Sequence, residues 1–535
     1  MTRIADTVAA TLKAHGVAHA FGMPGGEVVT LVDGLQQAGI PFHLARHETA
    51  AALMAAGAFS ATGAPGLLVT TVGPGLANAV NGIADAAQEH VPLVVISGVV
   101  DRSTRARYTH QVIDQAAMLR PLVKASFEIE PESVGATVAR ALALALAEPM
   151  GPVHLDLSPA VAAMAEMGGG PVAPPAVVRP AVAADDPAIG RIADRIAAAS
   201  RPVILAGLEA ARDGAGGALL ALAEAVGAPI LTTYKAKGLV PEHHPLALGG
   251  AGLSPIADRI LLGLIRDADL VLLVGYDPIE MRLGWLDPAP ADRIVEITGT
   301  PADHAMHHAG LRLAARPGAA LPALAARVKP RAGWPGGEPA AARRMLAERF
   351  ATPAGFGPHA IVDALNAAAG PDAVVTVDSG AHRILLSQKW VATRPLALLQ
   401  SAGFCTMAAA LPLAIGAKVA DPSRPVFAVM GDGGLEMGIG ELATLRDLKL
   451  PLTIVLFQDL SLALIALKQG AAGLASAGVT LGATDFAKVA EGFGGHGVTV
   501  DTTVALRDAL AAAPTRDRFT LIACRFDADA YQDAF

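Results

Sequence analysis

Two aspartates, each directly after a predicted buried strand, are the residues with the clearest capacity for chemistry. The apolar run Pro425 to Met430 ends at Gly431-Asp432-Gly433-Gly434, and the run Pro451 to Phe457 ends at Gln458-Asp459-Leu460-Ser461. Short continuous apolar runs of this kind predict parallel strands that are buried on both faces. The carboxyl ends of such strands meet at one edge of an open α/β sheet, where ligands bind.

The residues around these two acids suit a metal ion that holds a diphosphate. A hard cation such as Mg²⁺ prefers carboxylate and carbonyl oxygens as ligands, and bare glycine amides beside a helix N-terminus suit a phosphate. We expect the four residues 431–434 to turn tightly and one helix to follow from Glu436 to Leu448. An ordinary βαβ unit with two surface acids is the alternative interpretation.

The same stretch resembles the cofactor motif of thiamine diphosphate (ThDP) enzymes, in which G-D-G precedes a polar pair by roughly 27 residues. The resemblance implies a Mg²⁺ ion bound by Asp432, by Asp459 and by the backbone carbonyl of Ser461. Asp459 stands where the family usually has asparagine, and it supplies the same oxygen with more charge. The cofactor-binding residues implied in this region are Gly431, Gly433, Gly434 and Leu462.

The N-terminal part supplies a candidate proton-transfer residue, Glu48, between a strand that ends near Leu44 and a predicted helix from Ala50 to Ala61. ThDP chemistry needs a carboxyl group in an apolar pocket that hydrogen-bonds the aminopyrimidine ring. Burial favours the protonated form of such a carboxyl. In its R-H-E context, Glu48 resembles the family's activating glutamate. The alternative is a glutamate that only complements the helix dipole.

Three further segments resemble acetolactate-synthase-like members of the family. The F-G-M-P-G-G turn implies cofactor contacts from Pro24 and Gly25 and a catalytic role for Gly26. The G-P-G-L-A-N loop places Gly73 and Asn78 next to the pyrimidine, although Asn78 could equally cap a helix. Gln111, 13 residues before Lys124, matches the spacing of an active-site glutamine. The neighbouring His110 is either part of that site or a structural histidine.

The C-terminal part adds two motifs. Asp378-Ser379-Gly380-Ala381-His382 resembles the segment that touches the diphosphate, which implies contacts from Gly380 and His382. The segment from Ser401 to Met407 resembles the one whose methionine, here Met407, wedges ThDP into the bent form that brings its two rings together. Cys405 replaces a glycine there and adds a side chain near the thiazolium, but nothing in the sequence marks it as a nucleophile.

The order of elements predicts three α/β domains. A chain of 535 residues is too long for a single core, and helical patterns alternate with short apolar strands throughout. We expect three doubly wound parallel-sheet domains joined by Pro- and Gly-rich linkers at Gly168–Asp186 and Lys329–Ala341. In the ThDP family their order is pyrimidine-binding (residues 1–165), central (187–328) and diphosphate-binding (355–535).

Composition excludes several classes of function. The net charge is only −8 and there is no run of Lys or Arg, so nucleic acid and anionic membranes are not expected partners. No apolar span approaches membrane length, and the amphipathic start shows no signal-peptide pattern. Two cysteines, far apart in sequence, make a disulfide framework improbable. These features predict a cytoplasmic enzyme.

The resemblance covers essentially the whole chain and implies a 2-oxo acid decarboxylating carboligase of the flavin-free, catabolic acetolactate-synthase type. Gly275-Tyr276-Asp277-Pro278-Ile279-Glu280 replaces the R-F-D-D-R run of flavin-containing members, which predicts that FAD is not used. Ile465 lies where pyruvate-branch decarboxylases have glutamate, which favours carboligation. However, residues 155–160 lack the Pro–Lys pair of many acetolactate synthases.

Two other functions stay open at this point. The first is a lyase or decarboxylase that releases an aldehyde, and the second is a non-catalytic ThDP-binding homologue. The family also implies a homodimer or homotetramer with active sites at the subunit interface, acting on a small 2-oxo acid or aldehyde.

Overall fold

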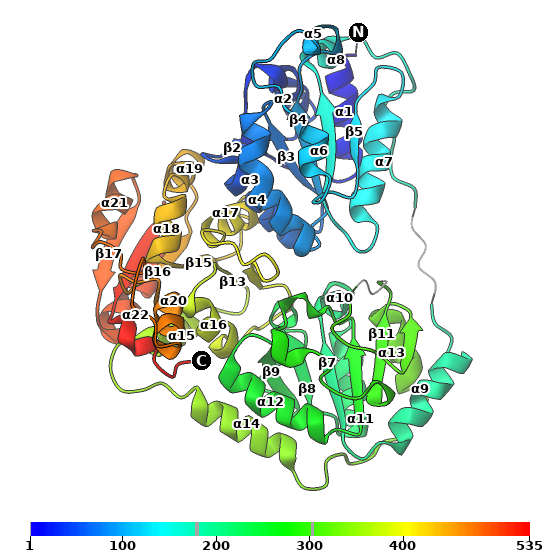
Figure 1. Ribbon diagram of the computed structural model, residues 1–535, viewed down its shortest axis with the longest axis vertical. Helices are drawn as coiled ribbons and strands as arrows, with labels where there is room; N and C mark the ends of the chain where they lie inside the picture. Colours follow the sequence, from blue (N-terminus) through cyan, green and yellow to red (C-terminus); the bar gives the residue numbers. More distant parts are fainter. Residues whose placement is uncertain (1, 177–180, 301–303) are drawn as a thin grey trace.

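The computed structural model describes residues 2–176, 181–300 and 304–535, and it contains three six-stranded parallel sheets, one after another along the chain. Figure 1 shows them as three lobes, from blue and cyan through green to yellow and red. Helices flank each sheet, which confirms the predicted α/β fold. In the described ranges, no helix is both long and apolar enough to span a bilayer.

The first lobe has the strand order β2-β1-β3-β4-β6-β5. Its strands are β1 Ala20–Met23, β2 Phe42–Leu44, β3 Gly66–Thr70, β4 Leu93–Gly98, β5 Ser126–Glu128 and β6 Val153–Leu157. Its helices are α1 Ile4–Ala14, α2 Val29–Gln37, α3 Glu48–Thr62, α4 Pro74–Gln88, α5 Arg102–Arg105, α6 Gln115–Leu119, α7 Val134–Leu146 and α8 Pro159–Ala163.

The central lobe has the order β12-β11-β10-β7-β8-β9. Its strands are β7 Pro202–Ala206, β8 Ile230–Thr233, β9 Ala247–Ala251, β10 Leu270–Val274, β11 Ile294–Thr298 and β12 Leu311–Ala314. Its helices are α9 Pro187–Ala198, α10 Leu208–Arg212, α11 Gly216–Val226, α12 Pro255–Asp267 and α13 Pro317–Ala325, and α14 Glu338–Arg349 leads to the next lobe.

The third lobe has the order β14-β13-β15-β16-β18-β17. Its strands are β13 Val374–Val377, β14 Leu398–Gln400, β15 Val426–Gly431, β16 Thr453–Gln458, β17 His496–Val500 and β18 Thr520–Arg525. Its helices are α15 Pro358–Ala368, α16 Ala381–Lys389, α17 Ala410–Ala420, α18 Asp432–Gly438, α19 Glu441–Leu448, α20 Ala463–Ala471, α21 Phe486–Gly492 and α22 Thr503–Ala512.

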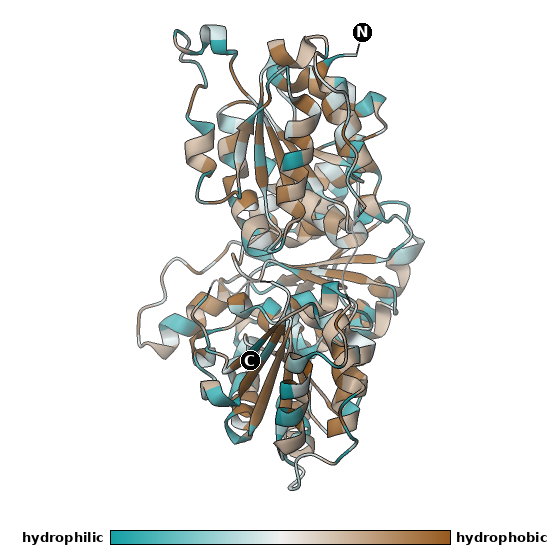
Figure 2. Cartoon of the chain, turned by 90° about the vertical axis from the view of Figure 1, so that its right-hand side faces the viewer, coloured by the Kyte–Doolittle hydropathy of each residue, from teal (hydrophilic) through white to brown (hydrophobic). Residues whose placement is uncertain are grey.

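Aliphatic strands and small helical residues build the cores. Strands such as β10 are buried along their whole length, and Figure 2 shows brown, apolar strands inside the lobes. Helices α3 and α17 join the first and third lobes at two glycines. A Cβ atom at Gly57 would overlap the backbone carbonyl of Leu413, and one at Gly416 would overlap that of Met54. Glycine is unfavourable inside a helix, but here it lets two backbones come into contact.

Three details differ from the expectations. The single helix predicted from Glu436 to Leu448 is wrong, because α18 begins at Asp432 and a break at Ile439 and Gly440 separates it from α19. Gly433 and Gly434 lie in the first turn of α18 rather than in a tight turn. The predicted second linker is too long, since α14 begins at Glu338. Residues 177–180 of the first predicted linker lie outside the described residues.

A buried polar network connects all three lobes. Asp85 on α4 and Glu89, the residue directly after it, face the third lobe: Ser401 donates its hydroxyl to Asp85, and Glu89 accepts 2.7 Å hydrogen bonds from the backbone N–H groups of Ala402 and Gly403. Lys235 of the central lobe forms an ion pair with Glu89. Burial, together with the charge of Glu89, raises the pKa of Asp85 to about 7.

Because the pKa of Asp85 is raised, we expect the free energy of unfolding to fall as pH rises. Between about pH 4 and pH 7 the folded chain keeps a proton that the unfolded chain has lost. In this range the free energy of unfolding decreases by on the order of 1 kcal/mol for each pH unit. Asp85→Asn keeps the oxygen that accepts from Ser401 but cannot ionise. We expect the midpoint of thermal unfolding to decline less with pH in this variant than in the wild type.

Exposed Asp508, which lies on α22, provides a matched control. Asp508→Asn should keep the wild-type pH profile. An unchanged profile in Asp85→Asn would show that Asp85 is ionised in the folded chain.

Candidate active site

The two acids of the G-D-G motif and its partner segment lie at adjacent strand ends. Strands β15 and β16 are neighbours in the third sheet. Asp432 follows β15; its Oδ1 accepts the N–H of Gly433 at 2.9 Å and its Oδ2 accepts the N–H of Leu460 at 2.7 Å. Asp459 follows β16, and its Oδ1 accepts the N–H of Ser461 at 2.9 Å. The sheet therefore brings both carboxylates to one edge, as predicted.

The electrostatics of this edge favour a bound cation. Burial raises the pKa of Asp432 above its ordinary value. Burial and the charge of Asp432 together raise the pKa of Asp459 to about 7. Among the described residues, neither carboxylate forms a salt bridge with a lysine or arginine. Two buried acids that repel each other are costly as anions, and a divalent cation between them would remove that cost.

Asp378 organises the surroundings of these acids. Its Oδ1 lies 2.8 Å from Nε2 of His382, and its Oδ2 accepts the N–H of Ala408 at 2.9 Å. A Cβ atom at Gly434 would overlap the Oδ2 atom of Asp378. Gly434 is thus required for close approach of α18 to Asp378. Gly380 is the residue before α16, and a Cβ atom there would lie within 2.6 Å of the His382 ring.

Apolar side chains gather beside Gly433. A Cβ atom on this glycine would lie 3.2 Å from Leu462 and 3.8 Å from the methyl group of Met407. Both residues are half-buried. Nearby, Cys405 has a φ of 56°, a backbone conformation in which glycine is usual. Its thiol lies 3.4 Å from Nη1 of Arg383.

Glu48 is the first residue of α3 and is only 4% exposed. Its Oε2 accepts a 3.1 Å hydrogen bond from Nδ2 of Asn78. Asn78 lies inside α4, so the alternative that it caps a helix is wrong. Gly75 faces the other carboxylate oxygen of Glu48, because a Cβ atom there would lie 3.3 Å away. The two N-terminal motifs therefore meet at one carboxyl group.

Glu441, which the sequence did not single out, fixes the chain just before Glu48. Its Oε1 accepts the backbone N–H groups of Arg46 at 2.9 Å and His47 at 3.0 Å. Glu441 is the first residue of α19, in the third lobe. Its partners are backbone N–H groups far away in sequence, so no local pattern could have revealed it.

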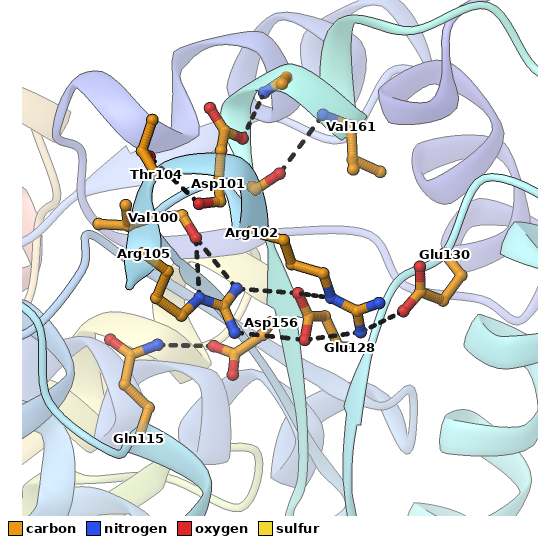
Figure 3. Close-up of polar contacts among 12 residues, drawn as sticks. Val100, Asp101, Arg102, Thr104, Arg105, Gln115, Glu128, Glu130, Asp156 and Val161 are labelled. Carbon is orange, nitrogen blue, oxygen red and sulfur yellow. Dashed lines mark hydrogen bonds and ion pairs between the residues drawn. The ribbon is translucent and has the colours of Figure 1, made fainter. Parts of the chain in front are cut away.

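Gln115 is a second residue that the sequence did not identify as functional. Its Oε1 accepts the N–H of Gly73 at 2.9 Å, and its Nε2 donates to Asp156 at 2.6 Å. Figure 3 shows Gln115 and Asp156 beside Arg102 and Arg105 of helix α5, which form ion pairs with Glu128. In contrast, the side chain of Gln111 is exposed, and its backbone carbonyl faces Gly73.

Gln115 and Asp156 border a cavity of about 540 Å³, whose wall also includes Val72 and Ile113. The role predicted for Gln111 stays a prediction, as does that of the exposed Gly26 and Pro24. Gly25 packs against Thr71, where a side chain would not fit.

In the described part of the chain, no hydrogen bond or ion pair joins Glu48 to Asp432 or Asp459. The first lobe holds one set of candidate residues and the third lobe holds the other. Contacts of α3 with α17 and of Arg46 and His47 with Glu441 connect the two lobes.

Comparison with known proteins places the lobes that hold both sets in one family. Residues 2–118 match the thiamine pyrophosphate enzyme N-terminal TPP binding domain, 189–324 the central domain and 378–524 the C-terminal TPP binding domain. The acetolactate synthase of Bacillus subtilis (strain 168) is 32% identical over 95% of this chain and 90% of its own length. The chain belongs to the acetolactate synthase-like thiamine pyrophosphate enzymes.

Two further relatives agree with this assignment. The catabolic acetolactate synthase of Raoultella terrigena is 30% identical over 98% of this chain and 95% of its own length. A solved structure, the thiamine diphosphate-dependent 4-hydroxybenzoylformate decarboxylase of Rhodococcus jostii RHA1, superposes with a TM-score of 0.84 at 25% identity. It covers 98% of this chain, and this chain covers 99% of it. This chain is therefore a ThDP-dependent enzyme.

We expect that adding one methyl group at Gly434, in the third lobe, strongly weakens the binding of ThDP. In Gly434→Ala the new Cβ atom must displace the carboxylate of Asp378, which frees the N–H of Ala408 and the ring of His382. We expect ThDP to bind roughly tenfold more weakly or worse, because misplaced positioning groups carry costs of this size. Binding can be measured by calorimetric titration at a fixed Mg²⁺ concentration.

Gly470→Ala is the matched control, because no atom lies within 4 Å of a Cβ atom at this exposed position on α20. It should bind ThDP like the wild type. Wild-type affinity in Gly434→Ala would contradict the role given to the Gly434–Asp378 contact.

Proposed function

We propose that this chain is a ThDP- and Mg²⁺-dependent decarboxylating carboligase that acts on 2-oxo acids in the manner of acetolactate synthases. One observation carries the choice of carboligation. Between Asp459 and Lys468 the chain has no ionisable side chain, and Ile465 on α20 is 44% exposed rather than packed in the core. A carboligase must withhold protons where carbon dioxide has left, so that an acceptor carbonyl can react there instead.

The residues of the chain divide the work as follows. Asp432, Asp459 and the carbonyl of Ser461 would hold Mg²⁺ and, through it, the diphosphate, with Gly431, Gly433, Gly434, Gly380 and His382 around it. Met407 and Leu462 would pack against the cofactor. When bound, ThDP supplies the centre that stabilises negative charge after a 2-oxo acid loses carbon dioxide. Glu48, held by Asn78, would exchange a proton with the aminopyrimidine ring.

A decarboxylase or lyase that releases an aldehyde is the second candidate. The similarity to a 4-hydroxybenzoylformate decarboxylase over nearly the full chain favours it, as does the lack of a Pro–Lys pair at residues 155–160. The products decide between the two candidates. Pyruvate alone should give acetolactate in the first case and acetaldehyde in the second.

The proposal includes no FAD. The central cavity near Asp277 is lined by Glu148, Glu209, Asp277 and Glu296 and by a single arginine, Arg212. Four carboxylates would repel the diphosphate of a flavin dinucleotide.

A second copy of the chain is part of the proposal, either as a homodimer or as a homotetramer with active sites between subunits. Its support is that Met437 and Leu474, in the lobe that carries the acids, are 67% and 65% exposed. The domain limits 1–165, 187–328 and 355–535 and a cytoplasmic location also stay predictions.

Release of carbon dioxide from a panel of 2-oxo acids tests the proposal directly. With ThDP and Mg²⁺ supplied, Glu48→Gln should lose about 10²–10⁴-fold in rate, because a lost acid–base group costs that much. Glu348→Gln, at an exposed position on α14, is the control and should keep the wild-type rate. If the wild type releases carbon dioxide from none of the acids, the 2-oxo acid assignment is wrong.

Ile465 offers a test of the carboligase branch. An acid at this position would offer a proton at the carbon from which carbon dioxide departed, so Ile465→Glu should raise the ratio of aldehyde to acetolactate roughly tenfold or more. Ile465→Gln has similar size and no such proton, and it should keep the wild-type ratio. Gas chromatography of both products gives the ratio, and equal ratios in the two variants would contradict the assigned role of Ile465.

A further inference from the structure

A cavity of about 440 Å³ that the proposed reaction does not use lies between the first and central lobes, with Gln88, His90 and Glu148 of the first lobe in its wall. It lies where β7, β10 and β11 end, and the order of the sheet reverses between β10 and β7. Open α/β sheets bind ligands at this position. Its lining carries four carboxylates against one arginine and two histidines, which favours a cationic occupant.

A cluster of possible metal ligands lies at one end of this cavity. Glu296 belongs to β11, whereas His304 and His307 lie in the segment between β11 and β12. One donor atom from each of these side chains lies within 4.8 Å of the others. The two imidazole rings are 4.8 Å apart between centroids. Glu296 and His304 line the cavity, and His307 is buried beside them.

We propose that Glu296, His304 and His307 form a binding site for a late first-row divalent metal ion, with Zn²⁺ as the reference ion. Two imidazole nitrogens and one carboxylate are a donor set that suits Zn²⁺. Mg²⁺ and Ca²⁺ prefer oxygen ligands only. Three protein ligands leave a fourth position for water or a small ligand from the cavity.

The ion pairs of Glu296 leave one polar atom of this cluster, Nε2 of His307, without a hydrogen bond among the described residues. Glu296 accepts through its Oε2 a 2.5 Å hydrogen bond from Nε of Arg312, across the β11–β12 register. Its Oε1 lies 3.4 Å from Nε2 of His307, yet this buried nitrogen has no hydrogen-bond partner among the residues that the structure describes. A buried polar atom without a partner is costly. A metal ion between Oε1 and Nε2 would give both atoms a strong partner and leave the arginine contact in place.

His304 would exchange a weak bond for a coordinate one. Its Nδ1 accepts a 3.3 Å hydrogen bond from the N–H of Met306. Coordination through Nδ1 replaces that bond, and coordination through Nε2 moves the ring proton to Nδ1 and breaks it. In either route the 3.3 Å hydrogen bond from Met306 is lost, and it is weak compared with a metal–imidazole bond. The bound ion would link His304 and His307 to β11, the strand that carries Glu296.

Zinc titration of the full-length chain, prepared without a polyhistidine tag, tests the site. Saturating ThDP and Mg²⁺ are present throughout so that the Asp432–Asp459 site is filled. We expect one Zn²⁺ per chain by calorimetry. His304→Ala and His307→Ala should each weaken binding roughly tenfold or more, as loss of a ligand must exceed loss of a supporting contact.

Exposed His308, next to His307 but outside the cluster, provides the matched control. His308→Ala should bind Zn²⁺ like the wild type. Substitution with Co²⁺ in the wild type adds an independent readout, since a four-coordinate site gives strong visible absorption bands. These bands should disappear in His304→Ala, whose half-buried position makes misfolding a lesser concern than at His307.

Two outcomes would overturn the inference. One is that the wild type binds no stoichiometric Zn²⁺, in which case the cluster is an ion pair of Glu296 with Arg312 and His307. The other is that His304→Ala and His308→Ala bind equally well. Because catalysis is not the readout, failure here leaves the proposed reaction untouched.

Discussion

The contact between α3 and α17 is the constraint on which the candidate site depends. At Gly57 and Gly416 the two helices touch backbone to backbone. The first residue of α3 is Glu48, and the segment just before α17 contains Met407. A wider separation of these helices would move the carboxyl group of Glu48 and the side chain of Met407 apart. Glu441 acts on the same arrangement by holding the two backbone N–H groups before Glu48.

Motif and periodicity sufficed for the strands around the G-D-G motif and for bringing Asp432 and Asp459 to neighbouring strand ends. The strand predicted from Pro425 to Met430 is β15 (Val426–Gly431), shifted by one residue at each end, since continuous burial on both faces leaves an unambiguous apolar run. Asp432 and Asp459 reached one sheet edge because topology alone decides where parallel strands end. Glu48 and Asn78 are near one another because their helices pack side by side in the first lobe.

Tertiary contacts decided what the sequence could not. The glycines after Asp432 suggested a turn, but they belong to helix α18. Position 434 requires a glycine because the carboxylate of Asp378 lies against it. The predicted long helix breaks at Ile439 and Gly440, which lets Glu441 begin a separate helix. Gln115 and Glu441 act on backbone groups from other elements. Such roles depend on three-dimensional neighbours, so residue type and local spacing carry no signal for them.

The order of the lobes along the chain has a consequence for biosynthesis. Each sheet is built from strands that are consecutive in the sequence, so each lobe can close its own core before the next leaves the ribosome. The contact of Gly57 with Leu413, in contrast, joins residues 356 positions apart. Such a distant pairing must wait for the third lobe. During synthesis the chain therefore passes through states that are folded but cannot catalyse, and catalytic competence is the last property it acquires.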